Sequence, residues 1–288
     1  MRGLLLIAAG GAVVAGLIGS TAFAGTDAKP EPREGITRAD LRGVNFIESC
    51  RFSHAASDDP IVFPGKAGAS HNHSFVGNRT TSASSTYASL RAGATSCERE
   101  ADTAAYWVPT LYQGANAVLP MGATIYYRRG TLDQVHTFPN NLRMIAGDQT
   151  ATTPQGRRVT FWNCGVNGGV EPSSTVPTCP DQRGSFLRLH IAFPNCWNGR
   201  SLDSVDHKSH MAYAMRGGSC PSTHPVSVPA IALIYRYPTR GGEGFSLASG
   251  GQLSAHADFL NAWHPAGLKK LVDGCLNALV HCGKAKSN

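Results

Sequence analysis

The sequence predicts a mainly β protein: one domain over residues 41–288, built as a β-sandwich of the jelly-roll kind with long loops, four disulfides and a C-terminal helix. Three observations favour this class. Short β-prone runs alternate with clusters of Gly, Pro, Asn and Ser, and the frequent glycines (32) and prolines (17) lie between the runs. The eight cysteines all follow the first 49 residues. One C-terminal segment alone has a helical pattern.

The first 24 residues have the pattern of an export signal. Arg2 precedes an apolar stretch from Leu4 to Ile18, and Ala22-Phe23-Ala24 fits a signal-peptidase site. The stretch is shorter than the ~20 residues that a membrane-spanning helix needs. We therefore expect a signal peptide at 1–24, a flexible segment at 25–40, and a secreted protein with no membrane anchor after cleavage.

An even number of cysteines in an exported chain predicts disulfides, because thiols oxidise outside the cytoplasm. The simplest pairing joins neighbours along the chain: Cys50–Cys97, Cys164–Cys179, Cys196–Cys220 and Cys275–Cys282. No Cys-x-x-Cys pair occurs, which argues against a structural zinc site of the usual spacing.

The candidate strands and the helix follow from periodicity. Strands are expected at 43–49, 123–128, 142–147, 158–163, 186–193, 209–215, 229–236 and 252–258. In 186–193 one face carries Leu187, Leu189, Ile191 and Phe193 and should be the core side, which leaves Arg188 and His190 on the other face. Residues 265–281 repeat apolar side chains at three- and four-residue steps after a proline, as an amphipathic helix does.

Histidines in three separate segments are the main functional signal. In the first segment, His71 and His73 point the same way in an extended chain, so they could hold one divalent metal or one substrate group between them. The spacing after Gly65 resembles the first cupin motif, but the glutamate expected downstream is absent, since residues 76–78 are Val, Gly and Asn.

The other two segments add carboxylates. Residues 193–221 contain Asp206, His207 and His210; if 209–215 is a strand, His210 faces the site while Met211, Tyr213 and Met215 face the core. Asp206 could instead make turn hydrogen bonds. Residues 250–265 place His256 and Asp258 on one strand face. A carboxylate beside an imidazole fixes its tautomer and raises its basicity, which suits a general base or a metal ligand.

Composition and missing motifs exclude several classes. The net charge of +7 is spread out, and the pairs Arg128-Arg129 and Arg157-Arg158 lack the interleaved aromatics of strand-binding surfaces, so no nucleic-acid partner is expected, although acidic polymers would be mildly attracted. The chain has no Gly-x-Ser-x-Gly elbow, phosphate-binding loop, dinucleotide fingerprint or His-Glu-x-x-His.

Several motifs in order, among them DPIV-x-PG, SHNHSFVGN, FPNCWNG, LDS-x-DHKSHMAY and HADFLNAW, resemble the secreted DUF1996 family of unknown function, often found beside WSC carbohydrate-binding modules. The resemblance runs from about residue 43 to 275. The family's positions carry over as His71, His73, Tyr106, Trp107, Trp197, Asp206, His207, His210, His224 and His256. The resemblance implies export, one domain and one shared site. The carbohydrate-binding modules found beside the family imply an extracellular polysaccharide or cell-wall glycan as partner.

Three functional hypotheses follow for this protein, which we expect to be a monomer. The first is a polysaccharide lyase or glycoside hydrolase that needs no cofactor, with catalytic residues drawn from the set His71, His73, His210, His256, Asp206, Asp258 and Tyr213. Its substrate would contact Arg188, His190, His207, Tyr106, Trp107 and Trp197, and Tyr106 is an alternative proton donor. The second is a mononuclear copper or zinc site on His71, His73 and either His210 or His256. The third is a non-catalytic glycan-binding module.

Overall fold

The computed structural model describes residues 35–165 and 170–285. The expected signal peptide lies outside these residues, as does most of the expected flexible segment. Within the described ranges no helix is both long enough and apolar enough to cross a membrane.

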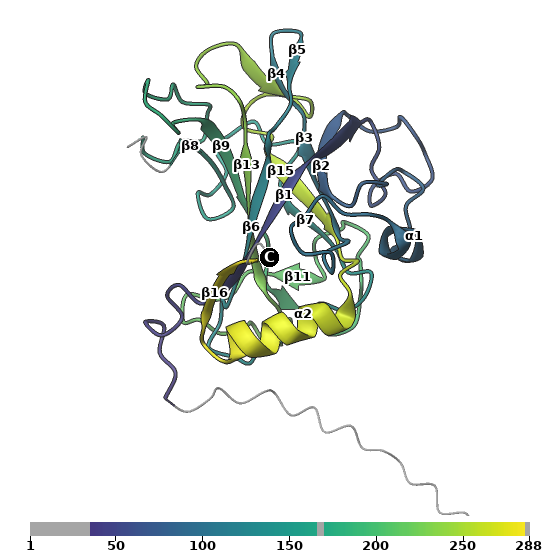
Figure 1. Cartoon of the computed structure of the whole chain (residues 1–288), viewed down its shortest axis with the longest axis vertical. Coiled ribbons are helices and arrows are strands. Elements are labelled where there is room, and N and C mark those ends of the chain that lie inside the picture. Colours follow the sequence, from purple (N-terminus) through teal and green to yellow (C-terminus); the bar gives the residue numbers. More distant parts are fainter. Residues whose placement is uncertain (1–34, 166–169, 286–288) are drawn as a thin grey trace, which may run out of the picture.

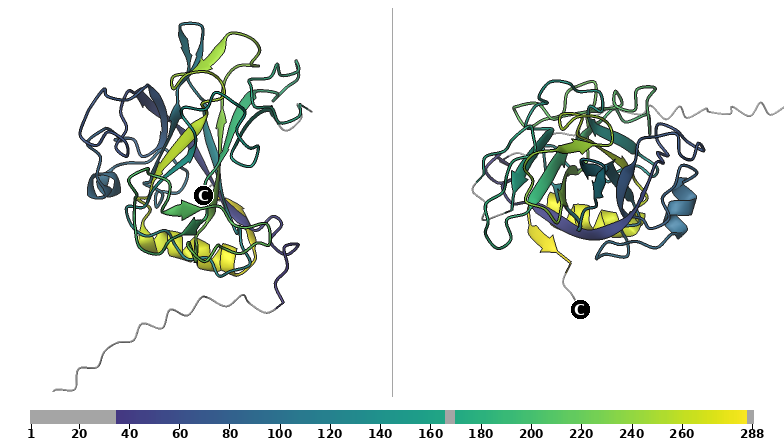
Figure 2. Two further views of the ribbon diagram at one scale, coloured as in Figure 1. Left: turned by 180° about the vertical axis from the view of Figure 1, so that it is seen from behind. Right: turned by 90° about the horizontal axis from the view of Figure 1, so that it is seen from above.

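The described chain is mainly β, as predicted (Figure 1). One antiparallel sheet curves until it nearly closes around the core, which the view from above shows best (Figure 2). Its strand order is β7 (Arg143–Gly147), β15 (His256–Leu260), β3 (Ala105–Pro109), β2 (His73–Gly77), β1 (Asn45–Ala56), β6 (Gly122–Arg128), β13 (Ala230–Arg236), β9 (Leu187–Ala192) and β8 (Thr160–Cys164), with β16 (His281–Lys284) parallel to β1.

Two small sheets extend the ends of this barrel-like sheet. One joins β11 (Met211–Ala212), β10 (Cys196–Trp197) and β12 (Val226–Ser227), and the other joins β14 (Phe245–Leu247), β4 (Leu111–Gln113) and β5 (Asn116–Val118). The second of these projects from the end of the molecule opposite the C-terminal helix (Figure 1).

The inner face of the large sheet holds the main core. Strand β9 shows why: Leu187, Leu189 and Ile191 are buried, whereas Arg188 and His190 between them are only partly buried, as the alternation predicts. Aromatic side chains from several strands fill the interior, for example Phe46, whose ring stacks on that of Tyr127 at 4.6 Å.

A second, smaller core lies on the outer face of β2, β3 and β15. There Phe75 and Trp107 pack with Ile61 and Leu90, which come from the covering segment, residues 57–72 and 78–92 on either side of β2, including the short helix α1 (Tyr87–Ala92). This segment lies beside β2 on the side of the molecule away from β8 and β9 (Figure 1). The sandwich-like packing therefore has one curved sheet and a layer of loops.

All four predicted disulfides are confirmed: Cys50–Cys97, Cys164–Cys179, Cys196–Cys220 and Cys275–Cys282. The predicted C-terminal helix is also present, as α2 (Pro265–Leu271) continued by the π-helical turn η1 (Val272–Asn277). It ends earlier than residue 281 because the chain reverses at Leu279, whose φ is +61°, and enters β16.

The prediction of a strand at 209–215 is wrong for most of that range. Only Met211–Ala212 pairs as a strand, and Tyr213 and Met215 are exposed rather than in the core, at 43% and 50% of their surface. The chain leaves the sheet after Ala212, so the alternation of faces that the prediction assumed stops there.

Candidate metal centre

The covering segment and the sheet bring three of the predicted histidines together. His73 begins β2 and His256 begins β15, and these strands flank β3 on its two sides. His73 pairs with Pro109 of β3, and continuing the register from Asp258–Trp107 places His256 on the other side of the same proline. His71, just before β2, completes the group.

The three imidazoles converge on one point. Their ring centroids lie 4.2 Å apart for His71–His73, 5.1 Å for His71–His256 and 5.9 Å for His73–His256. One ring nitrogen from each residue lies within 4.8 Å of the other two. Nitrogens that bind zinc in a tetrahedron are about 3.4 Å apart, so a small movement of the side chains brings these three to ligating distance.

Backbone carbonyls fix two of the rings in the tautomer that a metal ligand needs. The Nδ1–H of His73 donates to the carbonyl of Asp58 at 3.0 Å, and the Nδ1–H of His256 donates to the carbonyl of Ser254 at 2.9 Å. The Nε2 lone pairs therefore point away from these bonds. The Nε2 atoms of His71 and His73 are buried and have no hydrogen-bond partner.

Burial keeps the three rings neutral. It lowers the pKa of His71, lowers that of His256 to about 4, and lowers that of His73 well below its ordinary value. The neighbouring imidazoles lower the pKa of His73 further, since a positive charge on either one disfavours another. Neutral imidazole is the form that binds a metal.

Two buried carboxylates adjoin this cluster. Oxygens of Asp59 and Asp258 lie within 4.8 Å of each other and of a ring nitrogen of His73. An oxygen of Asp258 lies 3.9 Å from Nε2 of His256. Both Asp258 oxygens are buried without a hydrogen-bond partner, and its burial, with the charge of Asp59, raises its pKa well above the usual value.

A small pocket opens onto the His256 side of the cluster. Its volume is about 150 Å³, and its walls come from the strand ends and from the loop before β11; the polar lining residues are Asp59, Asp148, Gln149, Thr150, Asp206, His207, Lys208, His256 and Asp258. This space suits a water or a small group bound beside the cluster.

The residues present fit a divalent transition metal. Three neutral imidazoles, of which those of His71 and His73 have unpaired Nε2 atoms, and an adjacent carboxylate form a donor set that suits zinc, copper or iron. Thiolate ligands do not enter, because all eight cysteines form disulfides. The unpaired, buried donors are what distinguish this cluster from histidines that serve a structural role.

His210 lies outside this cluster. Its Nε2–H donates to the carbonyl of Arg143 at 2.6 Å, and its Nδ1 lies 2.9 Å from the hydroxyl of Ser204, so both nitrogens have partners. The sequence allowed either His210 or His256 as the third ligand. The structure places His256, and not His210, beside His71 and His73.

Asp206 and His207 lie on the loop that forms one wall of the pocket, but their side chains form hydrogen bonds within that loop. Asp206 accepts hydrogen bonds from the backbone of Lys208 and Ser209, and such bonds hold the pKa of its carboxyl far below the usual range. His207, with φ +56°, lies 2.9 Å from a carboxylate oxygen of Asp203. This is the turn role that the sequence left open for Asp206.

The aromatic residues predicted to contact substrate are not gathered at the pocket. Tyr106 is fully buried in the main core, where its hydroxyl donates to Asp102, and Trp107 is fully buried in the second core. The indole of Trp197 donates to the carbonyl of Ser201. Tyr213 is exposed, and its hydroxyl donates to the carbonyl of Ala192.

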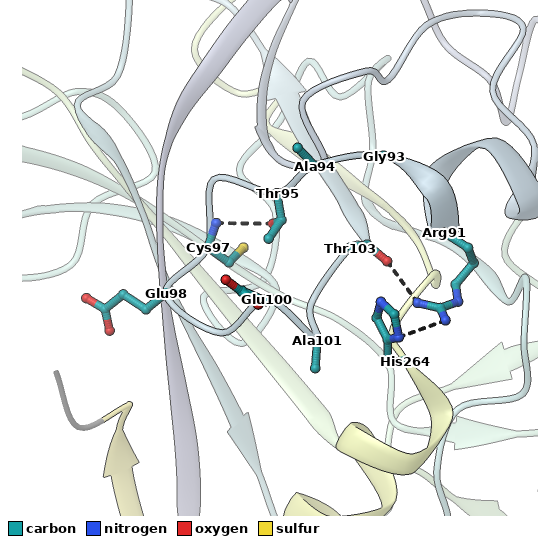
Figure 3. A pocket seen from close by; sticks show the side chains of 10 residues that line it. All are labelled: Arg91, Gly93, Ala94, Thr95, Cys97, Glu98, Glu100, Ala101, Thr103 and His264. Atoms are coloured by element: carbon teal, nitrogen blue, oxygen red, sulfur yellow. Dashed lines mark hydrogen bonds between the residues drawn. The ribbon is translucent and has the colours of Figure 1, made fainter. Parts of the chain in front are cut away.

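Arg188 and His190 lie on β9, on the part of the sheet away from the histidine cluster. His190 stacks on Phe161 at 4.3 Å and shares a hydrogen bond of 2.8 Å with Asn163. A larger hollow of about 730 Å³ beside α1 contains none of the predicted catalytic or substrate-binding residues; there Arg91 contacts His264 and Thr103 (Figure 3).

The sequence did not single out Asp59 or Lys208. Asp59 is the first residue of the DPIV motif. Its Oδ1 accepts hydrogen bonds from the backbone N–H groups of Ile61 and Val62, and these bonds fix the start of the covering segment beside the site. Lys208, whose ammonium donates to the carbonyl of Gly147, is the only Lys or Arg among the residues that line the pocket in the described chain. The position of Asp59 inside the DPIV motif was the one feature of the sequence that could have marked it as a site residue.

The fold and the cluster define a disulfide-linked β protein with a three-histidine centre under a layer of loops. A family model, the domain of unknown function DUF1996, matches residues 59–263, and the chain belongs to this family. The matched range contains every residue of the candidate centre. Neither the curated proteins nor the solved structures gave a match.

Proposed function

We propose that this protein binds one zinc or copper ion through His71, His73 and His256, and that the ion acts on a small group admitted through the adjoining pocket. The observation that carries the proposal is the set of buried, unpaired Nε2 atoms of His71 and His73. A buried polar atom without a partner costs about 1–3 kcal/mol, and a bound metal ion would offset that cost.

The donor set supports a reactive site better than a closed structural one. Structural zinc sites have four protein ligands, whereas catalytic sites keep one position for water or substrate. Here one of the three imidazoles, that of His256, lines a pocket of about 150 Å³. A metal ion at this place would polarise a bound water and lower its pKa, and Asp258, with an oxygen 3.9 Å from Nε2 of His256, is placed to serve as a fourth ligand.

Metal content tests this proposal directly. The tag-free protein is stripped with chelator, loaded separately with zinc and with copper, desalted, and analysed by elemental mass spectrometry. We expect about one equivalent of one of these metals, and a loss of most of it in His71→Ala, His73→Ala and His256→Ala. His210→Gln is the matched control, because it also removes a buried imidazole but leaves the cluster intact. Less than a tenth of an equivalent in the wild type, or equal losses in all four variants, would reject the metal centre.

Carbohydrate cleavage remains a second proposal, favoured by one observation. Asp206 and Asp258, the two carboxylates suggested for glycoside hydrolysis, line the same pocket. A screen of the mature protein against extracellular polysaccharides measures new reducing ends or unsaturated products. Cleavage by the wild type that is lost in Asp258→Asn supports this proposal, and the absence of any cleavage counts against it.

A further inference from the structure

A row of arginines crosses the outer face of the large sheet, on the half opposite the histidine cluster. Arg236 of β13 pairs directly with Arg188 of β9, and on its other side with Gly122 of β6, which in turn pairs with Arg51 of β1. Residues paired across neighbouring strands share one face, so the three arginine side chains leave the sheet on the same side, from positions aligned across strands that are about 4.8 Å apart.

These arginines have no acidic partners on the sheet. None of the ion pairs between described residues involves Arg51, Arg188 or Arg236. The Nε atoms of Arg188 and Arg236 are buried and lack hydrogen-bond partners. Like charges placed directly opposite each other destabilise a sheet, so this arrangement has a cost that folding alone does not explain.

The Arg51 end of the row opens into a polar groove. This groove has a volume of about 420 Å³, and its lining includes four cationic side chains and one acidic one: Arg51, Arg79, Arg236, Lys284 and Glu98. Gly122 separates Arg51 from Arg236 and has no side chain to fill the space between them. At the other end of the row, Arg188 pairs with Asn163 of β8, whose amide adds a neutral polar group.

The face next to the row carries apolar and uncharged polar side chains. Along β13, Ile234 and Ala232 follow Arg236 on the same side of the strand, and their cross-strand neighbours on β6 are Thr124 and Tyr126. The ring of Tyr126 is covered by the guanidinium of Arg128, which lies 4.8 Å from the ring centre. These positions, and His190 of β9 opposite Ile234, carry no acidic side chain that would repel an acidic chain lying across the strands.

We propose that this arginine row, Arg51, Arg188 and Arg236 with the adjoining groove, binds an acidic polysaccharide through the carboxylates of successive uronic-acid units. Guanidinium groups bind carboxylates through paired, charge-assisted hydrogen bonds, and a line of them matches a polymer that carries repeated carboxylates. Single-stranded nucleic acids need free aromatic faces for their bases, whereas on this face Arg128 covers the ring of Tyr126 and His190 stacks on the ring of Phe161. The binding surface is separate from the histidine cluster and does not depend on it.

Binding to polygalacturonate, a uronic-acid homopolymer, tests the proposal. Affinity is measured at low and moderate salt, with dextran as the neutral polymer and duplex DNA as the competing polyanion. The key variant is Arg51→Gln/Arg236→Gln, and the matched control is Arg157→Gln/Arg158→Gln, which removes the same charge from two exposed arginines of a turn. Arg51→Gln alone, at an exposed position, provides the same test if the double variant folds poorly.

We expect the wild type to bind polygalacturonate and not dextran, with affinity that falls as salt rises. The row variant should lose about tenfold or more in affinity, while the control loses less than about twofold. His73→Ala should bind polygalacturonate like the wild type, so failure of the metal proposal leaves this result unchanged. The proposal is overturned if the wild type does not bind, if both double variants lose affinity equally, or if duplex DNA binds more tightly than polygalacturonate.

Discussion

Replacing Asp258 by leucine should stabilise the metal-free protein, although it changes a fully buried residue at the candidate centre. The carboxylate lies on β15 between Trp107 of β3 and Ile145 of β7, and both of its oxygens lack partners. Leucine has a similar branched shape and would suit these apolar neighbours. A group that weakens the fold in this way is typical of a functional site.

The magnitude follows from the lost hydrogen bonds. An unsatisfied buried polar group costs about 1–3 kcal/mol, so Asp258→Leu should raise the free energy of unfolding by that amount. For a domain of this size, about 2–4 °C of melting temperature corresponds to each kcal/mol. The variant should therefore melt roughly 2–12 °C above the wild type after chelation.

A second buried aspartate provides the control. Asp102 is also fully buried, but it accepts hydrogen bonds from the hydroxyl of Tyr106 at 2.9 Å and the backbone N–H of Ala104 at 3.1 Å. Asp102→Leu should lower the free energy of unfolding by about 3 kcal/mol or more, because it leaves these donors unpaired. Calorimetry of both variants in chelator measures the contrast. If Asp258→Leu destabilises the protein as much as Asp102→Leu does, the carboxylate of Asp258 has partners in the metal-free protein and our account of the centre is wrong.

Three further predictions concern the fold. Gly77→Ala should lower the free energy of unfolding by about 3 kcal/mol, because φ is +84° and the new methyl would lie 2.4 Å from the carbonyl oxygen of Ala104; denaturant unfolding measures it, and a loss under 1 kcal/mol would contradict it. Burial, together with the charges of Arg188 and Arg128, lowers the pKa of His190 to about 4, below its unfolded value of 6.5. Unfolding therefore takes up a proton as the pH falls from 6.5 to 4, and the wild type should lose about 3 kcal/mol over this range that His190→Gln does not lose; parallel urea titrations at several pH values test this, and equal slopes would refute it. Removing the Cys196–Cys220 disulfide, whose cysteines are 24 residues apart, with the double serine variant should cost about 3.5 kcal/mol, and an unchanged guanidinium midpoint would show that the cross-link adds nothing.

The sequence predicted β9, in which buried and partly buried residues alternate, and missed β2 and β3, in which they do not. Strand β9 has one buried and one open face, so its period of two is plain in the residues. Strands β2 and β3 are buried along their whole length, between the main core and the covering segment, and therefore carry no alternation. Pro109 at the end of β3 further weakened the signal for a strand.

The site was predictable in part, for a related reason. His71 and His73 are two residues apart, so an extended chain places their side chains on the same side without any contact from elsewhere in the fold. His256 joins them because β15 and β2 are both neighbours of β3, and no local pattern contains that strand order. His210 has the same kind of sequence context, with an aspartate nearby, but its nitrogens are taken by the backbone of Arg143 and the hydroxyl of Ser204.

The Cys50–Cys97 disulfide has a consequence for how the chain withstands proteases. It closes a covalent ring that runs from β1 through the whole covering segment, and the ring contains Asp59, His71 and His73. The exposed turn around Gly65 and Lys66 is the natural place for a cut within this ring. A single cut there would leave both fragments attached to the same molecule, so the nicked protein would run as one band until it is reduced.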